Sequence, residues 1–251
     1  MLEVGPLTIH AGVGTDASVL VREVSFTMPG SGITALIGPS GCGKTSVLKW
    51  LAGLRSKGLR AEGQVLLDGA PLRRPCRALC YQPQGDALFP WLTIAENAAL
   101  GLEVAGMSRR RAIAQVTPLF APFGLAGCEA QFPVQLSGGM RQRAAFLRTV
   151  AREGRYVLLD EPFSALDAVT RLRMQDWLLA RLHERPCGVL LVTHDLHEAA
   201  RLADRILVMA ADPGRIIAEI VVPTPQDQRD EAGMAPLRET LKSLLLEEHP
   251  R

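Results

Sequence analysis

The sequence lacks most features that mark a metal-binding, secreted or nucleic-acid-binding protein. Its five cysteines are an odd number and form no Cys-x-x-Cys pair, which argues against a zinc site and favours reduced thiols. The 28 basic and 26 acidic side chains give a net charge of only +2. A nucleic-acid-binding protein normally carries a strong basic excess, so we expect no nucleic-acid partner.

Long hydrophobic runs are also missing. No segment approaches the roughly 20 apolar residues that a membrane-spanning helix needs. The first ten residues, MLEVGPLTIH, do not have the basic segment and apolar run of a signal peptide. We therefore expect a chain that does not itself cross a membrane. With 251 residues, 47% of them hydrophobic, it is long enough for one large domain or two small ones.

Short apolar runs alternate with helical patterns along most of the chain. Residues 155–162 and 187–195 contain continuously apolar runs, as strands buried on both faces of a parallel sheet do. Further strand patterns lie at 32–38, 63–69, 77–84 and 206–210, and helical patterns at 45–54, 168–184 and 195–205. The alternation predicts an α/β fold with a largely parallel sheet.

The helices are not evenly distributed. Between Ala95 and Ala151 only helical patterns occur, which indicates a helical lobe inserted into a sheet-bearing lobe. We expect one domain over about 1–233, with a sheet lobe at about 1–86 and 154–221 and a helical lobe at about 87–153. Residues 222–251 are expected to form a linker and a short C-terminal helix.

The segment GPSGCGKT matches the phosphate-loop pattern G-x-x-x-x-G-K-[ST] between a predicted strand and a predicted helix. Its glycines let backbone N–H groups turn toward a phosphate, and the helix N-terminus adds partial positive charge. Lys44 would reach the β- and γ-phosphates, and Thr45 would offer its hydroxyl to Mg²⁺. The predicted nucleotide-binding residues are Gly38, Pro39, Ser40, Gly41, Cys42, Gly43, Lys44 and Thr45.

Three polar residues follow the ends of buried strands, where open α/β sheets hold their ligands. Asp160 ends the strand YVLLD and is a candidate Mg²⁺ ligand. Glu161, the next residue, is a candidate for accepting a proton from, or orienting, the attacking water. His194 ends the strand GVLLVTH and could hydrogen-bond the γ-phosphate and the water. We interpret His197, inside the following helix, as solvent-exposed.

Together with these motifs, LSGGM at Leu136–Met140 makes the chain resemble the ATP-binding cassette (ABC) ATPases, whose signature sequence it matches. The resemblance implies a phosphate-loop NTPase fold with a RecA-like sheet lobe and an inserted helical lobe. It also implies that Ser137, Gly138 and Gly139 contact the γ-phosphate of an ATP held by a second copy. The active unit would then be a head-to-tail dimer, of this chain or of this chain with a related cassette, with ATP and Mg²⁺ as cofactors.

Two further motifs match this family. YQPQ resembles the Q-loop, and the spacing to LFPWLT favours Gln84 over Gln82 as the residue that contacts Mg²⁺ and the attacking water. SALD, at Ser164–Asp167, resembles the loop that crosses the dimer interface. The resemblance extends from about Ser18 to Arg215.

One departure concerns the base of the nucleotide. The family usually has an aromatic residue upstream of the phosphate loop that stacks on adenine, but LTIHAGVGTDASVL contains no Phe, Tyr or Trp. Either His10 or aliphatic contacts would hold the base, and we expect weak discrimination between ATP and GTP.

The segment Asp86–Gly106 places Leu88, Phe89, Trp91 and Leu92 beside the Q-loop. Core packing accounts for some of these residues, but a Pro-Trp pair in a loop is typical of a docking surface. In the family this region receives a cytoplasmic helix of a permease.

The sequence most resembles the importers of nitrate, sulfonates and taurine. The resemblance implies a peripheral subunit on the cytoplasmic face of the cell membrane, with integral permease subunits and, indirectly, an external solute-binding protein. Alternatives are a non-transport cassette in DNA repair or translation, a phosphate-loop kinase, an exporter cassette, and an importer of metals, lipids or amino acids.

Overall fold

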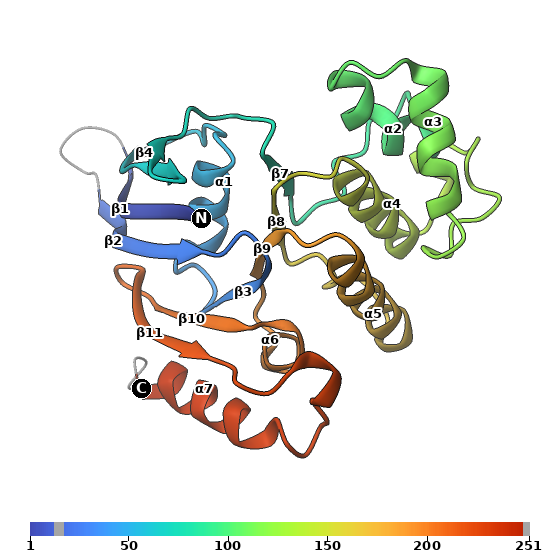
Figure 1. The fold of residues 1–251 in the computed structure, drawn as a ribbon. Coiled ribbons are helices and arrows are strands. Elements are labelled where there is room, and N and C mark those ends of the chain that lie inside the picture. The colour runs from blue at the N-terminus through green and yellow to red at the C-terminus, as the bar shows by residue number, and fades with distance from the viewer. Residues whose placement is uncertain (13–17, 248–251) are drawn as a thin grey trace. The chain divides into compact units, whose positions relative to one another are not determined.

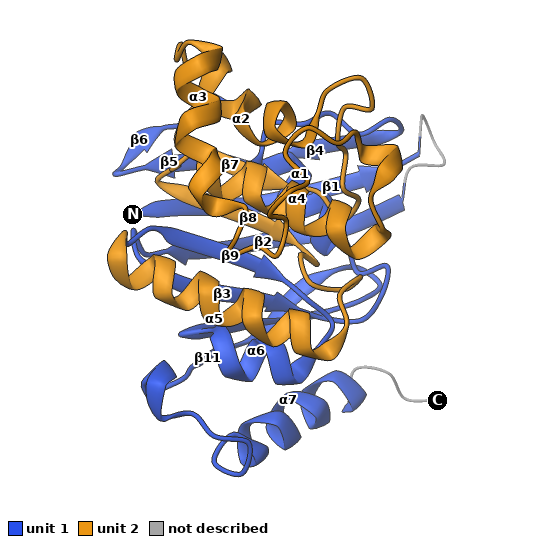
Figure 2. Ribbon diagram, turned by 90° about the vertical axis from the view of Figure 1, so that its right-hand side faces the viewer, with its two compact units in different colours: residues 1–76, 186–251 blue, residues 77–185 orange. Residues whose placement is uncertain are grey.

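The computed structural model describes residues 1–12 and 18–247. The chain divides into two compact units (Figure 2). Unit 1 comprises Met1–Cys76 and Pro186–Arg251, and unit 2 comprises Arg77–Arg185. These bounds differ from those of the lobes expected from the sequence, and the lobe boundaries stay a prediction.

Unit 1 contains an antiparallel sheet in the order β2-β1-β5-β6, with β4 also paired to β1. Its strands are β1 (Leu2–Ala11), β2 (Ser18–Met28), β4 (Leu59–Glu62), β5 (Val65–Leu67) and β6 (Ala70–Pro71). The sequence pattern predicts a strand at β5 but does not predict β1 or β2. Gly5 and Pro6 interrupt the alternation of β1, and the pairing with β2 shifts register between Val4 and Leu7.

The other strands of unit 1 are β3 (Gly32–Ile37), β9 (Gly188–Val192), β10 (Arg205–Ala210) and β11 (Arg215–Val221). They lie in the order β11-β10-β3-β9. Strand β3 is parallel to β9 and β10, as predicted, whereas β11 is antiparallel to β10. The helices of this unit are α1 (Lys44–Leu51), α6 (Leu196–Leu202), α7 (Ala235–Glu247) and the 3₁₀ turn η4 (Gln226–Gln228).

Unit 2 contains two parallel strands and four α-helices (Figure 1). The strands are β7 (Leu79–Gln82) and β8 (Tyr156–Asp160). The helices are α2 (Ile94–Val104), α3 (Arg109–Val116), α4 (Gly138–Ala151) and α5 (Ala168–Glu184), with 3₁₀ turns η2 (Thr117–Leu119) and η3 (Pro133–Gln135). Helix α2 packs against α3 and α4. The predicted helix at 168–184 is confirmed as α5.

An aromatic cluster forms part of the core of unit 2. The rings of Phe123 and Phe146 contact each other and Trp177, with centroid distances of 4.6 to 5.9 Å, and Phe163 lies edge-on to Phe146. Such edge-to-face pairs add to the stability that their burial gives. Within residues 1–12 and 18–247, none of the helices combines the length and apolarity needed to cross a bilayer.

Candidate functional site

The phosphate-loop segment lies between β3 and the start of α1 in unit 1. Gly43 immediately precedes the helix with φ of 98°, and a Cβ there would lie 2.4 Å from Cγ2 of Val21. Both facts require glycine at this position. The ammonium of Lys44 donates hydrogen bonds to the carbonyl oxygens of Gly38 and Pro39, each at 2.8 Å. The lysine therefore lies inside the curve of its own loop.

The other loop residues have surroundings that are compatible with a bound anion. Ser40 and Gly41 are exposed, and Gly41 also has a positive φ, of 84°. Cys42 is buried, with its Sγ 3.7 Å from Nζ of Lys44. The first turn of α1, which includes Thr45, contains no acidic residue. A helix N-terminus without acidic side chains favours a bound phosphate. All eight predicted nucleotide-binding residues thus lie in one loop and one helical turn.

In unit 2, Asp160 and Glu161 follow one another at the end of β8. Asp160 is fully buried and accepts a hydrogen bond of 3.4 Å from the hydroxyl of Tyr81. Glu161 accepts one of 3.1 Å from Nε2 of Gln84. The structure therefore brings together three of the predicted site residues, and it adds Tyr81.

The hydroxyl of Tyr81 stays protonated. Burial, the negative charge of Asp160 and the hydrogen bond to that carboxylate raise the pKa of Tyr81 far above its ordinary value. The residue is thus a permanent donor to Asp160. The sequence shows that Tyr81 belongs to YQPQ, three residues before Gln84, but its contact with Asp160 is visible only in the structure.

Glu161 has an unusual backbone conformation. Its φ is 48°, in the left-handed region that a residue with a side chain rarely adopts. Such conformations cost on the order of 1–3 kcal/mol and cluster at functional sites, where the surrounding structure maintains them. Here the turn also aims the carboxylate at the amide of Gln84.

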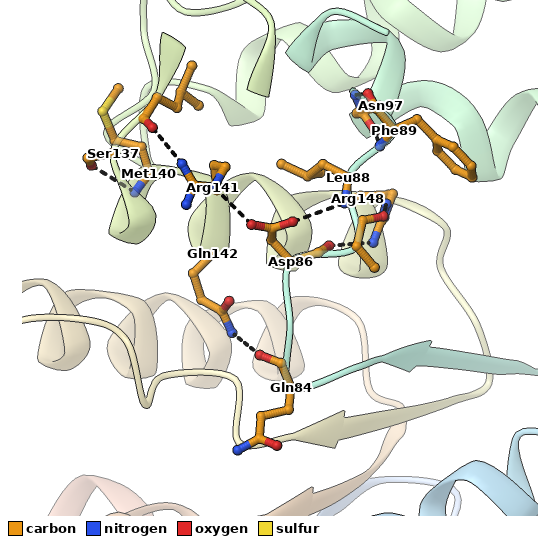
Figure 3. Close-up of polar contacts among 12 residues, drawn as sticks. Gln84, Asp86, Leu88, Phe89, Asn97, Ser137, Met140, Arg141, Gln142 and Arg148 are labelled. Atoms are coloured by element: carbon orange, nitrogen blue, oxygen red, sulfur yellow. Dashed lines mark hydrogen bonds and ion pairs between the residues drawn. The ribbon is translucent and has the colours of Figure 1, made fainter. Parts of the chain in front are cut away.

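The segment that follows Gln84 is held by helix α4 (Figure 3). Arg148 donates to the carbonyl oxygens of Asp86 and Ala87 at 2.9 and 2.7 Å, and Arg141 forms an ion pair of 2.9 Å with the Asp86 side chain. Nε2 of Gln142 donates to the carbonyl oxygen of Gln84 at 3.4 Å. The sequence motifs above do not include these residues, and the one available signal is that Arg141 and Arg148, seven residues apart, share one helical face.

The signature segment forms the N-terminus of α4. The hydroxyl of Ser137 caps the helix by accepting from N–H of Met140 at 3.3 Å. Gly138 and Gly139 have helical conformations, so backbone strain does not require them. Among the described residues, the nearest atoms to an added Cβ at either glycine are 3.7 Å away or more. Nothing that the structure describes within this chain explains why both positions are glycine.

The remaining candidates have distinct environments. His194 is exposed and follows β9 in unit 1. His197 is 65% exposed, which confirms its interpretation as solvent-exposed, and its Nδ1 lies 3.1 Å from the Glu231 carboxylate. Gln82 is fully buried, and neither Nε2 nor Oε1 has a hydrogen-bond partner in the part of the chain that the structure describes.

The candidate ligand atoms are oxygens of the kinds that bind Mg²⁺ in proteins. Within the described ranges no group of three or more His, Cys, Asp or Glu side chains could hold a metal by itself. Mg²⁺ usually takes one or two carboxylates and leaves its other positions to phosphate and water. The hydroxyl of Thr45, the carboxylate of Asp160 and the amide oxygen of Gln84 are ligands of that kind.

The comparisons with known proteins decide the family. The family model described as ABC transporter matches residues 21–164 of this chain. The chain belongs to the ABC transporter family. Within it, the chain is 40% identical over 247 residues to the aliphatic sulfonates import ATP-binding protein SsuB 1 of Xanthomonas axonopodis pv. citri, covering 97% of this chain and 96% of that relative. The taurine import ATP-binding protein TauB of Yersinia pestis is 38% identical over 200 residues, which cover 80% and 77% of the two chains.

Solved structures of ABC cassettes share the fold. The dimeric structure of the bacterial ABC transporter cassette MJ0796 aligns with a TM-score of 0.78 at 26% identity, covering 90% of this chain and all of that one. A post-hydrolysis dimer of MJ0796 with ADP and Pi aligns with a TM-score of 0.77 at 26% identity over the same shares. The fold is thus the ABC ATPase fold, and this family member is an ATP-binding ATPase, as the resemblance implied.

Proposed function

We propose that this chain is the ATP-hydrolysing subunit of an ABC importer and works as a head-to-tail dimer beneath a separate permease. The observation that carries the proposal is the unexplained pair of glycines at the start of α4. Glycine is costly in a helix, yet nothing described in this chain needs it there. A phosphate held by a second copy, approaching the bare N–H groups of Gly138 and Gly139, would need it.

Each copy would bind ATP through its own phosphate loop. Backbone N–H groups and Lys44 would hold the β- and γ-phosphates. Thr45, Asp160 and Gln84 would hold Mg²⁺, which when bound neutralises charge on the phosphates. Tyr81 would keep Asp160 oriented, because its protonated hydroxyl donates to that carboxylate.

Hydrolysis would depend on Glu161. Its carboxylate would accept a proton from the attacking water while the amide of Gln84 keeps it in place. His194 would hydrogen-bond the γ-phosphate and the water. Gln84 also begins the segment held by Arg141 and Arg148. A movement of Gln84 on ATP binding or hydrolysis would therefore be transmitted to that segment.

The permease would dock on unit 2. A cavity of about 350 Å³ lies there, lined by Cys80, Tyr81, Ala87, Phe89, Leu100, Gly101, Val104, Arg148, Thr149 and Arg152. Trp91 is 69% exposed, and its ring centroid lies 5.3 Å from that of Phe89. An exposed aromatic pair next to an apolar cavity suits a helix of a membrane partner. This use would place the subunit at the cytoplasmic face of the membrane.

The solute class is proposed from the relatives. Proteins named for the import of aliphatic sulfonates and taurine align over most of this chain. We therefore favour nitrate, a sulfonate, taurine or a related small solute, delivered by an external solute-binding protein. A second candidate solute class is formylaminopyrimidine. The chain is 35% identical over 246 residues to the formylaminopyrimidine import ATP-binding protein ThiZ of Halalkalibacterium halodurans.

The test is purification of tagged Glu161→Gln from its native membranes with ATP and Mg²⁺. This variant should bind ATP but lose nearly all turnover, which keeps the complex assembled. Wild type and Lys44→Ala are the matched controls. Recovery of one integral membrane permease with Glu161→Gln but not with Lys44→Ala is the expected result. Recovery of only soluble or ribosomal partners would contradict the transport role.

A further inference from the structure

Arg141 of helix α4 contacts two segments that lie far from each other in the sequence (Figure 3). Its Nε donates a hydrogen bond to Oδ2 of Asp86 at 2.9 Å, and its Nη1 donates to the carbonyl oxygen of Leu136 at 2.8 Å. Asp86 lies two residues after Gln84, and Leu136 is the first residue of the signature segment. We propose that Arg141 is a positioning residue, which keeps the signature segment in place for the ATP of the second copy only while Asp86 holds it. The inference deepens the proposed function and rests on it.

Arginine is an unfavourable residue at this point of a helix. Arg141 is the fourth residue of α4, the N-terminus of which carries partial positive charge, and the first turn contains no acidic residue. Asp86 supplies a negative charge from a segment 55 residues earlier in the chain. The helix start that carries the signature glycines thus depends on a carboxylate from outside the helix.

Asp86 is in turn fixed within its own segment. Its Oδ1 accepts a hydrogen bond from the N–H of Leu88 at 3.2 Å, and its carbonyl oxygen accepts one from Arg148 at 2.9 Å. Phe89, which follows Leu88, lines the cavity that is proposed to receive the permease. A displacement of this segment would therefore move the carboxylate that Arg141 contacts.

The shape of the guanidinium makes this connection rigid. Its donors lie in one plane with fixed directions, so Nε and Nη1 cannot move independently. A shift of Asp86 would therefore either pull Arg141 away from Leu136 or move the signature segment with it. Lysine could not replace this arginine fully, because one ammonium on a flexible chain does not hold two acceptors at fixed positions.

Arg143, two residues further along α4, offers a matched control. It also donates to two backbone carbonyl oxygens, those of Phe123 and Gly124, at 2.8 and 3.1 Å. These acceptors belong neither to the segment after Gln84 nor to the signature segment. Loss of Arg143 should therefore lower the stability of the protein without breaking the connection between Asp86 and the signature segment.

The first measurement is a double-mutant cycle on the purified full chain, with Asp86→Asn, Arg141→Gln and the variant that carries both. Asparagine keeps an acceptor for Leu88 and removes the charge. The dissociation constant for ATP should stay within about twofold of wild type, because the phosphate loop is untouched, whereas kcat should fall about fivefold in each single variant. The double variant should fall no further, because both changes remove the same contact. Arg141→Lys should lie between wild type and Arg141→Gln.

The second measurement is amide hydrogen exchange of the same chains without ATP. In Asp86→Asn, the N–H groups of residues 137–143 should exchange about fivefold faster than in wild type, because the start of α4 has lost its support. In the control, the effects of Arg143→Gln and Asp86→Asn on kcat should multiply, since these two residues share no hydrogen-bond partner.

Three outcomes would overturn the positioning role. They are independent losses of kcat that multiply in the Asp86→Asn/Arg141→Gln variant, an unchanged kcat in all three variants of the cycle, and faster exchange confined to residues 84–89. Failure of the proposed function would be recognised separately. If Gly139→Asp hydrolyses ATP as fast as wild type, the signature segment contacts no ATP, and the proposed role of Arg141 fails with it.

Discussion

Two buried glutamines in unit 2 have opposite surroundings. Gln142 is 4% exposed, and its Nε2 donates to the carbonyl oxygens of Gln84 and Pro162. Gln82 is fully buried at the end of β7, with neither side-chain polar atom partnered by any described residue. A buried amide without a partner is destabilising, whereas one that satisfies backbone carbonyls is not.

Replacing each glutamine by methionine should change the free energy of unfolding in opposite directions. Gln82→Met removes an unsatisfied group at similar volume and should raise the free energy of unfolding by about 1–2 kcal/mol. Gln142→Met leaves the carbonyl oxygens of Gln84 and Pro162 without this donor and should lower the free energy of unfolding by a similar amount. Urea denaturation of both variants measures the difference. A loss of stability in Gln82→Met would show that this amide has a partner in the folded protein.

The raised pKa of Tyr81 predicts that the stability of the protein depends on pH. The pKa of Tyr81 is raised from the ordinary value of 10 by burial, and further by Asp160. Because the unfolded chain loses this proton first, the contribution of Tyr81 to stability is complete below pH 10 and declines as the pH rises above it. Tyr81→Phe should therefore show a shallower alkaline loss in the free energy of unfolding. Equal slopes for wild type and variant between pH 9 and 11 would contradict this account.

At the level of elements, helix α4 combines two tasks. Its N-terminus carries the signature glycines, and its side chains hold the segment after Gln84 (Figure 3). The glycines weaken the helix, since each costs up to about 1 kcal/mol relative to alanine. The chain thus has a less stable helix start where a second copy is proposed to approach.

Gly139→Ala should raise the stability of the protein while lowering its ATPase activity. A Cβ at this position would make ordinary contacts, 3.7 Å from Ala165 O and 3.8 Å from Leu166 Cδ2. The variant should be more stable by roughly 0.5–1 kcal/mol and should lose most ATPase activity. Thermal unfolding and steady-state hydrolysis measure the two effects. Full activity in this variant would mean that no phosphate approaches these N–H groups.

The elements also show which structure the sequence could predict. Helix α5 and the buried strands β8 and β9 were predictable, because their patterns are continuous and local. Strands β1 and β2 were not, because register shifts and the Gly5-Pro6 pair obscure their alternation. Motif residues such as Lys44 could be found from spacing alone. Tyr81 and Arg148 could not, because their partners lie 79 and about 60 residues away in the sequence.

At the scale of the whole molecule, the proposed catalytic groups are divided between the units and between copies. The phosphate loop belongs to unit 1, while the signature segment and Glu161 belong to unit 2. In the proposed dimer, the loop of one copy would face the signature segment of the other. Each ATP site would then need residues from two chains, so a single chain should have little activity. A closed two-fold assembly of this kind contains two equivalent sites.

The most direct test of this arrangement is complementation between two inactive variants, Lys44→Ala and Gly139→Asp. If the sites are shared, mixed dimers contain one site with an intact loop and an intact signature. We predict that mixing restores ATPase activity that neither variant has alone. The matched control mixes wild type with the double variant Lys44→Ala/Gly139→Asp, whose mixed dimers have no intact site, so the activity should fall. No recovery in the first mixture, together with unchanged wild-type activity in the second, would contradict the head-to-tail site.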